Sequence, residues 1–200
     1  MTTIEDVLDN PSLLVAAAED GIEALLRLID PDPDRPGLRD TPSRVVRAML
    51  EYAAQGHTSV ADLLAVTFEE HCDEVVLVGP IEFTSLCEHH LMPFHGVGHI
   101  AYIPDGHRVV GLSKLPRLLD HFARRPQVQE RLTREVADAL VEHLDPVGVG
   151  VVLVASHTCM TMRGARKPGA AMTTSATRGA FRDEPSARAE LLSLIEMSRV

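Results

Sequence analysis

The densest group of reactive side chains in this 200-residue chain lies at residues 87–90, which read Cys-Glu-His-His. A cysteine and a histidine at this spacing can bind one zinc ion, because a turn brings both side chains to one point. A third soft ligand, Cys159, follows the apolar stretch 147–155. The three ligands Cys87, His90 and Cys159 would leave one position of a tetrahedral zinc site open for water, which is typical of catalytic zinc.

Two further histidines, His89 and His157, accompany these ligands in the sequence. In an extended chain His157 and Cys159 point to the same face. A histidine titrates near neutral pH, so both histidines could move protons beside a metal. The spacing alone leaves a simpler explanation open, since a free cysteine is usually a small buried hydrophobic residue. Cys72 has no comparable partners and is expected to be structural.

Two other segments offer groups that could bind a nucleotide. Ser113, Lys114 and Arg117 fall at the start of an expected helix, where free backbone N–H groups and the helix dipole attract phosphate. Glu130 lies early in the next expected helix, and its carboxylate could accept two parallel N–H donors, such as N1 and N2 of guanine. Ordinary helix capping and a favourable charge at a helix start would explain the same residues without any ligand.

The charge of the chain is unevenly distributed. The net charge of −10 disfavours nucleic-acid binding, and residues 1–80 hold 16 acids against 5 bases. Residues 156–182 instead hold five bases and no acid. This stretch fits a small phosphate-bearing ligand, or equally a solvated strand edge whose bases block aggregation. The five bases are Arg163, Arg166, Lys167, Arg178 and Arg182.

The composition excludes several classes of protein. With 45% hydrophobic and 24% charged residues the chain is expected to fold. Its longest apolar run, residues 147–155, is far shorter than the roughly 18 residues of a membrane helix. The acidic N-terminal residues do not resemble a signal peptide, and three cysteines cannot form a disulfide framework. We therefore expect a cytoplasmic protein without nucleic-acid or membrane partners.

The elements that must position these side chains follow from periodicity and turn signals. Helices are expected at 12–30 with Ser12 as cap, from Thr41, at 59–66, at 113–125, from Pro126 and at 185–197. Strands are expected at 74–78, 81–86, 147–155 and 172–181, and a hairpin joins 94–103 to 108–112. This order predicts an α+β fold in which antiparallel strands surround a helical pair. We expect an N-terminal helical region at residues 1–72 and the main domain at 73–200.

Several longer segments occur together and in the order of a known family. They are residues 37–45, 85–90, 111–117, 124–133, 157–164 and 173–176. From about residue 15 to its end, the sequence resembles GTP cyclohydrolase I. The resemblance implies a tunnelling fold (T-fold), usually assembled as a homodecamer of two face-to-face pentamers. It also implies hydrolysis of GTP to 7,8-dihydroneopterin triphosphate and formate, the first step toward folate and other pterins.

The resemblance also implies roles for individual residues. One zinc ion per subunit would be bound by Cys87, His90 and Cys159, with His89 and His157 as the acid–base histidines. Glu130, with Gln129 beside it, would hold the guanine edge. Ser113 would assist near the ribose and the phosphates. The triphosphate would be held by Lys114, Arg117, Arg163 and, from a neighbouring subunit, Arg44.

Two alternatives differ from this hypothesis in their chemistry. Another T-fold enzyme, such as a nitrile reductase, would need a nucleophilic cysteine and an NADPH site but not three zinc ligands. A catalytically idle homologue with a structural metal would be expected to have lost His89 or His157, and both are present. Fe(II) or Co(II) would also fit a site of two cysteines and one histidine.

Overall fold

The structure is a computed structural model that describes residues 10–54, 58–106 and 108–198. Contacts divide the chain into two compact units, Met1–Tyr52 and Ala53–Val200. The division of the chain expected from the sequence, between residues 72 and 73, stays a prediction. No helix in the described part of the chain is long and apolar enough to cross a membrane.

The first unit consists of helix α2 (Pro11–Ile29), a short 3₁₀ turn η1 (Pro36–Leu38) and helix α3 (Thr41–Tyr52). The expected cap of α2 is wrong by two residues, because the side chain of Asn10 accepts the backbone N–H of Ser12. Pro11 then occupies the first helical position, where a missing N–H costs nothing. None of the described side chains of α2 or α3 is buried within this chain.

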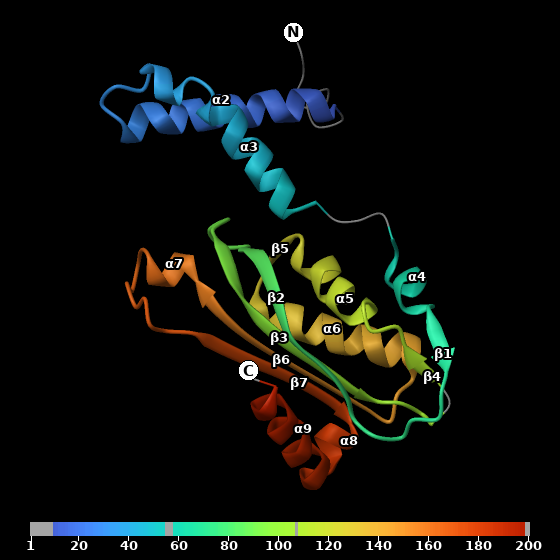
Figure 1. Ribbon diagram of the computed structural model, residues 1–200. Helices are drawn as coiled ribbons and strands as arrows, with labels where there is room; N and C mark the ends of the chain where they lie inside the picture. The colour runs from blue at the N-terminus through green and yellow to red at the C-terminus, as the bar shows by residue number, and fades with distance from the viewer. Residues whose placement is uncertain (1–9, 55–57, 107, 199–200) are drawn as a thin grey trace. The chain divides into compact units, whose positions relative to one another are not determined.

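The second unit is built on a five-stranded sheet in the order β5-β2-β3-β6-β7 (Figure 1). Its strands are β2 (Val76–Cys87), β3 (Pro93–Ile103), β5 (Pro126–Gln127), β6 (Gly148–His157) and β7 (Met172–Gly179). All neighbours are antiparallel except the short β5, which runs parallel to β2. The strands expected at 74–78 and 81–86 form the single strand β2, whose register shifts between Val78 and Ile81.

Two details of the expected topology are wrong. Strand β4 (Arg108–Val110) does not form a hairpin with β3 but pairs with β1 (Thr67–Glu69), a strand that the sequence did not indicate. The helix expected from Pro126 begins instead at Gln129, because residues 126–127 pair with the end of β2. This pairing is extended by the N–H of Glu88, which donates to the carbonyl of Gln127.

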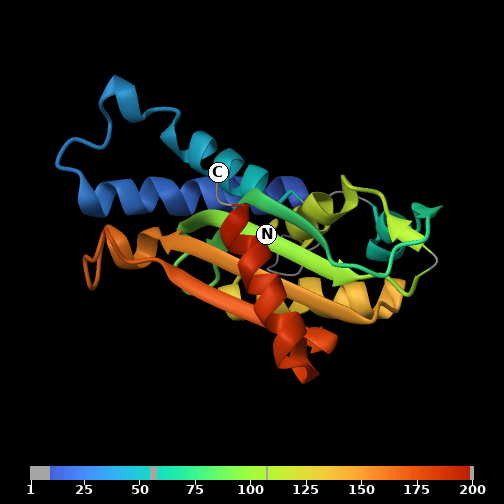
Figure 2. The ribbon, with the colours of Figure 1, turned by 60° about the horizontal axis from the view of Figure 1, so that its bottom comes forward.

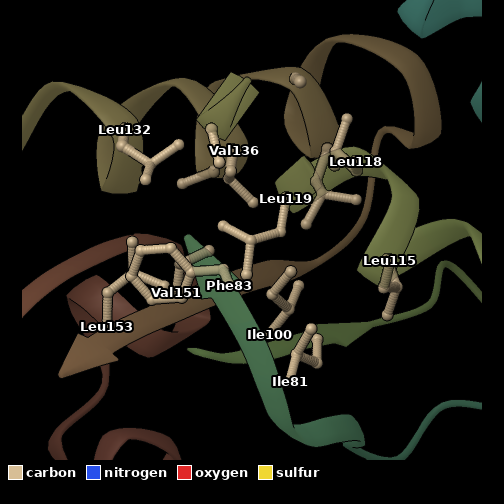
Figure 3. Close-up of a cluster of buried hydrophobic side chains, with 14 of the residues drawn as sticks. Ile81, Phe83, Ile100, Leu115, Leu118, Leu119, Leu132, Val136, Val151 and Leu153 are labelled. Carbon is tan, nitrogen blue, oxygen red and sulfur yellow. The ribbon is translucent and has the colours of Figure 1, made fainter. Parts of the chain in front are cut away.

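Helices cover the sheet on both faces. On one face, α5 (Lys114–Ala123) and α6 (Gln129–Leu144) bury side chains such as Phe83, Ile100 and Val151 (Figure 3). On the other, α8 (Ala180–Asp183) and α9 (Pro185–Met197) cover Ala101 and Val152 (Figure 2). Because neighbouring residues of β3 and β6 are buried on opposite faces, β6 is an almost continuous apolar run. The predicted α+β fold with its helical pair is confirmed.

Candidate active site

Three potential metal ligands meet where β2 ends and β6 passes into the short helix α7 (Thr158–Thr161). One ligand atom each from Cys87, His90 and Cys159 lies within 4.8 Å of the other two. The two Sγ atoms are 3.8 Å apart, and Sγ of Cys87 is 3.7 Å from Nδ1 of His90. A tetrahedral ion with Zn–S bonds of about 2.3 Å would hold two sulfurs roughly 3.8 Å apart. The donor set and its spacing therefore fit zinc.

A tight turn between β2 and β3 brings Cys87 and His90 together. The N–H groups of His90 and Leu91 both donate to the carbonyl of Cys87, at 3.2 and 2.8 Å. The N–H of Cys87 donates to the carbonyl of Met92 at 2.9 Å, which closes the turn. Leu91 adopts a left-handed conformation with a φ of 51°. The reversal within four residues makes this half of the cluster a local feature of the sequence.

The other half of the cluster depends on the sheet. Phe94 at the start of β3 pairs with His157 at the end of β6. The hydroxyl of Thr158 donates to the carbonyl of Pro93 at 2.6 Å and ties α7 to the same end of β3. These contacts bring Cys159 beside Cys87.

The thiol of Cys159 has an environment that favours its neutral form. Burial raises the pKa of Cys159, and the adjacent Cys87 thiol raises it further, while the charge of Arg163 lowers it slightly. Two adjacent sulfurs become thiolates together only if a cation compensates their charge.

His157 is held on two sides. Its ring stacks on Phe94 with centroids 4.5 Å apart and planes 5° from parallel. Its Nε2 lies 2.8 Å from Oε1 of Gln129. Burial lowers the pKa of His157, and the negative charge of Glu130 opposes that shift. The imidazole is therefore biased toward its neutral form.

Gln129 lies at the start of α6 and is completely buried. Its Nε2 donates to the carbonyls of Leu153 and Met172 and to Oγ1 of Thr174, at 3.0–3.1 Å. Oγ1 of Thr133 lies 2.6 Å from Oγ1 of Thr174 and donates to the carbonyl of Gln129 at 2.7 Å. The side chain expected at the guanine edge is thus bound within the protein.

His89 differs from His157 in its exposure. Its side chain is 65% exposed, and Nδ1 lies 3.9 Å from the sulfur of Cys87. The preceding Glu88 forms an ion pair with Arg131 of α6, which lowers the pKa of Glu88. The side chain of Arg131 also donates to Oε1 of the buried Gln127 at 2.8 Å. Helix α6 therefore supports the turn that carries His89.

The remaining predicted residues near the cluster are exposed. Glu130 lies in the first turn of α6, and its charge acts on His157. Arg163 follows α7, and its charge acts on Cys159. A carboxylate and a guanidinium thus lie within electrostatic range of the cluster, where polar ends of a nucleotide could bind.

Lys114 and Arg117 lie elsewhere on the same unit. They line a pocket of about 450 Å³ between α4 (Val60–Leu64) and α5, together with His121 and Arg124. The acids Asp62 and Asp120 also line this pocket, and burial raises the pKa of Asp120. The starts of α5 and α7 lie at opposite ends of the sheet in both views (Figures 1 and 2). One chain therefore does not bring Lys114 and Arg117 to its own Cys-His-Cys cluster.

Ser113 and Arg44 are the remaining predicted residues. Ser113 precedes α5, but its side chain makes no capping hydrogen bond, so the expected cap is wrong. Arg44 belongs to the first unit, where it pairs with Asp40 at 3.1 Å.

The sequence interpretation missed three residues that support the site: Phe94, Thr133 and Arg131. Thr133 follows Gln129 by four positions on α6, and both side chains are buried. Two polar residues on one buried helix stripe are a detectable signal of a polar network. Phe94 had no such signal, because its contact with His157 depends on the register of β3 and β6.

A family model described as GTP cyclohydrolase I matches residues 18–196 of this chain. The chain belongs to the GTP cyclohydrolase I family. Its mixed α+β architecture, with antiparallel strands and an N-terminal helical region, agrees with the T-fold of that family.

Curated members of the GTP cyclohydrolase I family match over most of their length. The chain is 56% identical over 182 residues to "GTP cyclohydrolase 1" of Mycolicibacterium vanbaalenii, covering 90% of each chain. It is 56% identical over 179 residues to "GTP cyclohydrolase 1" of Thermobifida fusca, covering 88% of this chain and 86% of the relative. Identity to "GTP cyclohydrolase 1" of Thermoanaerobacter pseudethanolicus is 50% over 178 residues, covering 89% of this chain and 95% of the relative.

Proposed function

We propose that this chain hydrolyses GTP to 7,8-dihydroneopterin triphosphate and formate, with one zinc ion per chain bound by Cys87, His90 and Cys159. The observation that carries the proposal is the Cys-His-Cys cluster, whose ligand atoms lie within 4.8 Å of one another. The half-buried His157 and the exposed His89 lie beside it, in a chain of the GTP cyclohydrolase I family. Both alternatives to this function lack a comparable supporting observation.

The chemistry requires water to attack C8 of the guanine ring. Zinc, when bound, supplies a water molecule whose pKa is lowered to about 7. Glu130 accepts N1–H and the N2 amino group of guanine, which orients the imidazole part of the base. His89 donates a proton to N7 and thereby makes C8 more electrophilic. Hydrolysis opens the ring to a formamide, and a second hydrolysis releases formate.

The later steps rearrange the sugar. His157 exchanges a proton with the ribose, which opens its ring and allows an Amadori rearrangement. The freed amino group then condenses with the rearranged sugar to close the pterin ring. The triphosphate is not consumed, so Lys114, Arg117 and Arg163, with Ser113 nearby, bind and orient the substrate.

The location of these cations favours a site shared between subunits. The hydroxyl of Ser85 donates to the carbonyl of Ala123 at 2.6 Å, so α5 ends near the metal cluster and begins far from it. Its nine residue steps span about 14 Å at ~1.5 Å each. We propose that Lys114 and Arg117 serve the cluster of a neighbouring copy, and that Arg44 serves one from the first unit. This arrangement fits a decamer of two pentamers with sites between subunits.

The proposed roles also divide the chain. All proposed site residues except Arg44 lie within 73–200, which we propose as the catalytic domain. Residues 1–72 then form the N-terminal helical region, whose contribution to the site is Arg44.

The experiment that tests this function is one incubation of zinc-loaded protein with GTP. Absorbance of the dihydropterin, formate and zinc content are measured on the same sample, with Cys159→Ser as the matched control. We expect formate and pterin in equal amounts from the unchanged protein and neither from the control. Absence of both products from protein that holds about one zinc per chain would overturn the proposal and favour an idle or differently specific homologue.

A further inference from the structure

We infer that Gln129 is a positioning residue for His157: its amide oxygen keeps a proton on Nε2, so proton exchange with the substrate takes place at Nδ1. The inference rests on the proposed function only for the identity of that substrate. It gives Gln129 a different role from the guanine contact that the family resemblance implies.

The orientation of the Gln129 amide follows from its partners. Two of them, the carbonyl oxygens of Leu153 and Met172, can only accept hydrogen bonds. The NH₂ group must therefore face these carbonyls, since a flipped amide would place its oxygen against two other oxygens. Oε1 then faces Nε2 of His157 at 2.8 Å.

Two threonines reinforce this orientation. Thr133 donates its hydroxyl proton to the carbonyl of Gln129, so the hydroxyl of Thr174 must donate to Oγ1 of Thr133. The oxygen of Thr174 is then free to accept from the NH₂ group of Gln129. The hydrogen bonds thus run in one direction, from the amide of Gln129 to Thr174, from Thr174 to Thr133, and from Thr133 to the backbone carbonyl of Gln129.

The direction of these hydrogen bonds determines which nitrogen of His157 carries a proton. Oε1 of Gln129 can only accept, so Nε2 of His157 must be the donor in the neutral and in the charged imidazole. Nδ1 is then the nitrogen without a proton in the neutral form. The stacked ring of Phe94, 5° from parallel, fixes the plane of the imidazole. Rotation of the ring would break the bond to a side chain that is completely buried.

Gln129 has no capacity left for a substrate. Its two N–H groups already serve three acceptors, and none of the side chain is exposed. Glu130, the next residue, is exposed at the start of α6. Glu130 is therefore accessible to a substrate, whereas the side chain of Gln129 is bound to His157.

The decisive measurement is the protonation of each ring nitrogen of His157 in the zinc-loaded full chain. Magic-angle-spinning NMR of protein with ¹³C,¹⁵N-labelled histidine gives it, and His157→Gln identifies the signal by its loss. The pH is set to about 8.5, above the ordinary imidazole pKa of about 6.5. We expect a proton on Nε2 and none on Nδ1. A proton on Nδ1 would overturn the inference.

Gln129→Met provides the second arm, because methionine has a similar length but no hydrogen-bonding amide. We expect the fixed Nε2 proton to be lost, with kcat for GTP about 10- to 100-fold lower and KM within about threefold of the unchanged protein. A raised KM with unchanged kcat and an unchanged His157 signal would instead show a substrate contact and overturn the inference.

Val136→Ala is the matched control. It truncates another buried side chain of α6 and leaves the bond between Gln129 and His157 in place. We expect the Nε2 proton to persist and kcat to stay within about threefold. Loss of the Nε2 proton in both variants would show general damage to the core and contradict a specific role for Gln129. The NMR result holds whatever the substrate, so failure of the GTP assay alone would count against the proposed function and not against this inference.

Discussion

The sulfur of Cys159 lies 3.8 Å from the sulfur of Cys87, although 72 positions separate the two residues in the sequence. Strand β3 lies between β2 and β6, and these neighbours carry the two cysteines at or just beyond their ends. Helix α7 reaches back along the start of β3 through the bond from Thr158 to Pro93. The sheet thus assembles the Cys-His-Cys cluster, and a metal bound there should stabilise this end of the sheet.

The first prediction concerns the metal. Cys159→Ser or His90→Ala should reduce zinc to well below one ion per chain and abolish GTP turnover, because two remaining ligands hold the ion weakly. Elemental analysis and the formate assay on the same samples measure both effects. Cys72→Ser is the control, since Cys72 lies outside the cluster and its thiol donates to the carbonyl of Glu74. Full turnover by either cluster variant would refute the ligand assignment.

The second prediction separates proton transfer from metal binding. His89→Ala should keep the zinc but lower kcat about 10²- to 10⁴-fold, the usual contribution of a general acid. The side chain is 65% exposed, so its removal should leave the fold intact. Zinc content and kcat are compared with those of His143→Ala, at the other end of α6. Unchanged kcat, or loss of zinc together with kcat, would contradict the assigned role.

The third prediction concerns guanine binding. Glu130→Gln should weaken GTP binding by about 1.5–3 kcal/mol, or roughly 10- to 150-fold, because hydrogen bonds to a charged group are lost. Zinc content should not change. Isothermal titration with GTP measures the Kd, and Glu142→Gln on the exposed later part of α6 is the matched control. A Kd equal to that of the control would exclude Glu130 as the guanine partner.

The local half of the site could be predicted from the sequence, and the other half only with the resemblance. Cys87 and His90 lie within one turn, so their spacing already indicates that both could bind the same metal ion. Cys159 became a candidate because it follows a recognisable buried strand, although the pairing that brings it to Cys87 depends on the register of β6. The hydrogen-bond partner of His157 could not be predicted. Gln129 lies beside His157 because α6 packs against β6 and β7, and this packing is not evident from local sequence.

Most elements of the fold could also be predicted, since their periodicity and caps are local. The failures are failures of pairing. A Pro-Asp-Gly turn at 104–106 favours a hairpin. Strand β4 instead pairs with β1 in a separate two-stranded sheet, where Val110 lies opposite Thr67. The contact between β2 and β5 likewise replaced the first turn of an expected helix. Sequence patterns specify which segments are extended but not which partner each strand finds.

The fourth prediction concerns stability at low pH. Burial lowers the pKa of His121, and the nearby charge of Arg125 lowers it further. The unfolded chain, with an ordinary histidine pKa of about 6.5, therefore binds a proton before the native protein does. The free energy of unfolding should fall as the pH drops through about 6.5. The contribution of His121 should be absent at about pH 8, where both states are neutral.

Urea unfolding of His121→Gln at about pH 8 and pH 6 measures this contribution. We expect the variant to lose less stability between the two values than the unchanged protein at the same protein concentration. His143→Gln shows how much of the effect comes from removing any histidine. Equal losses in the variant and the unchanged protein would remove His121 from the explanation.

The fifth prediction tests whether the site is shared between copies of the chain. Cys159→Ser damages the metal cluster, and Arg117→Ala damages the pocket at the start of α5, so each variant alone should be inactive. Chains of both kinds, co-expressed and mixed at random, should regain about a quarter of the unchanged activity. That is the share of sites that draw an intact cluster from one chain and an intact Arg117 from its neighbour. A site made by one chain would regain none. Co-expression of Cys159→Ser with His90→Ala is the control, since both defects lie in the same cluster and no mixture of the two chains can repair it.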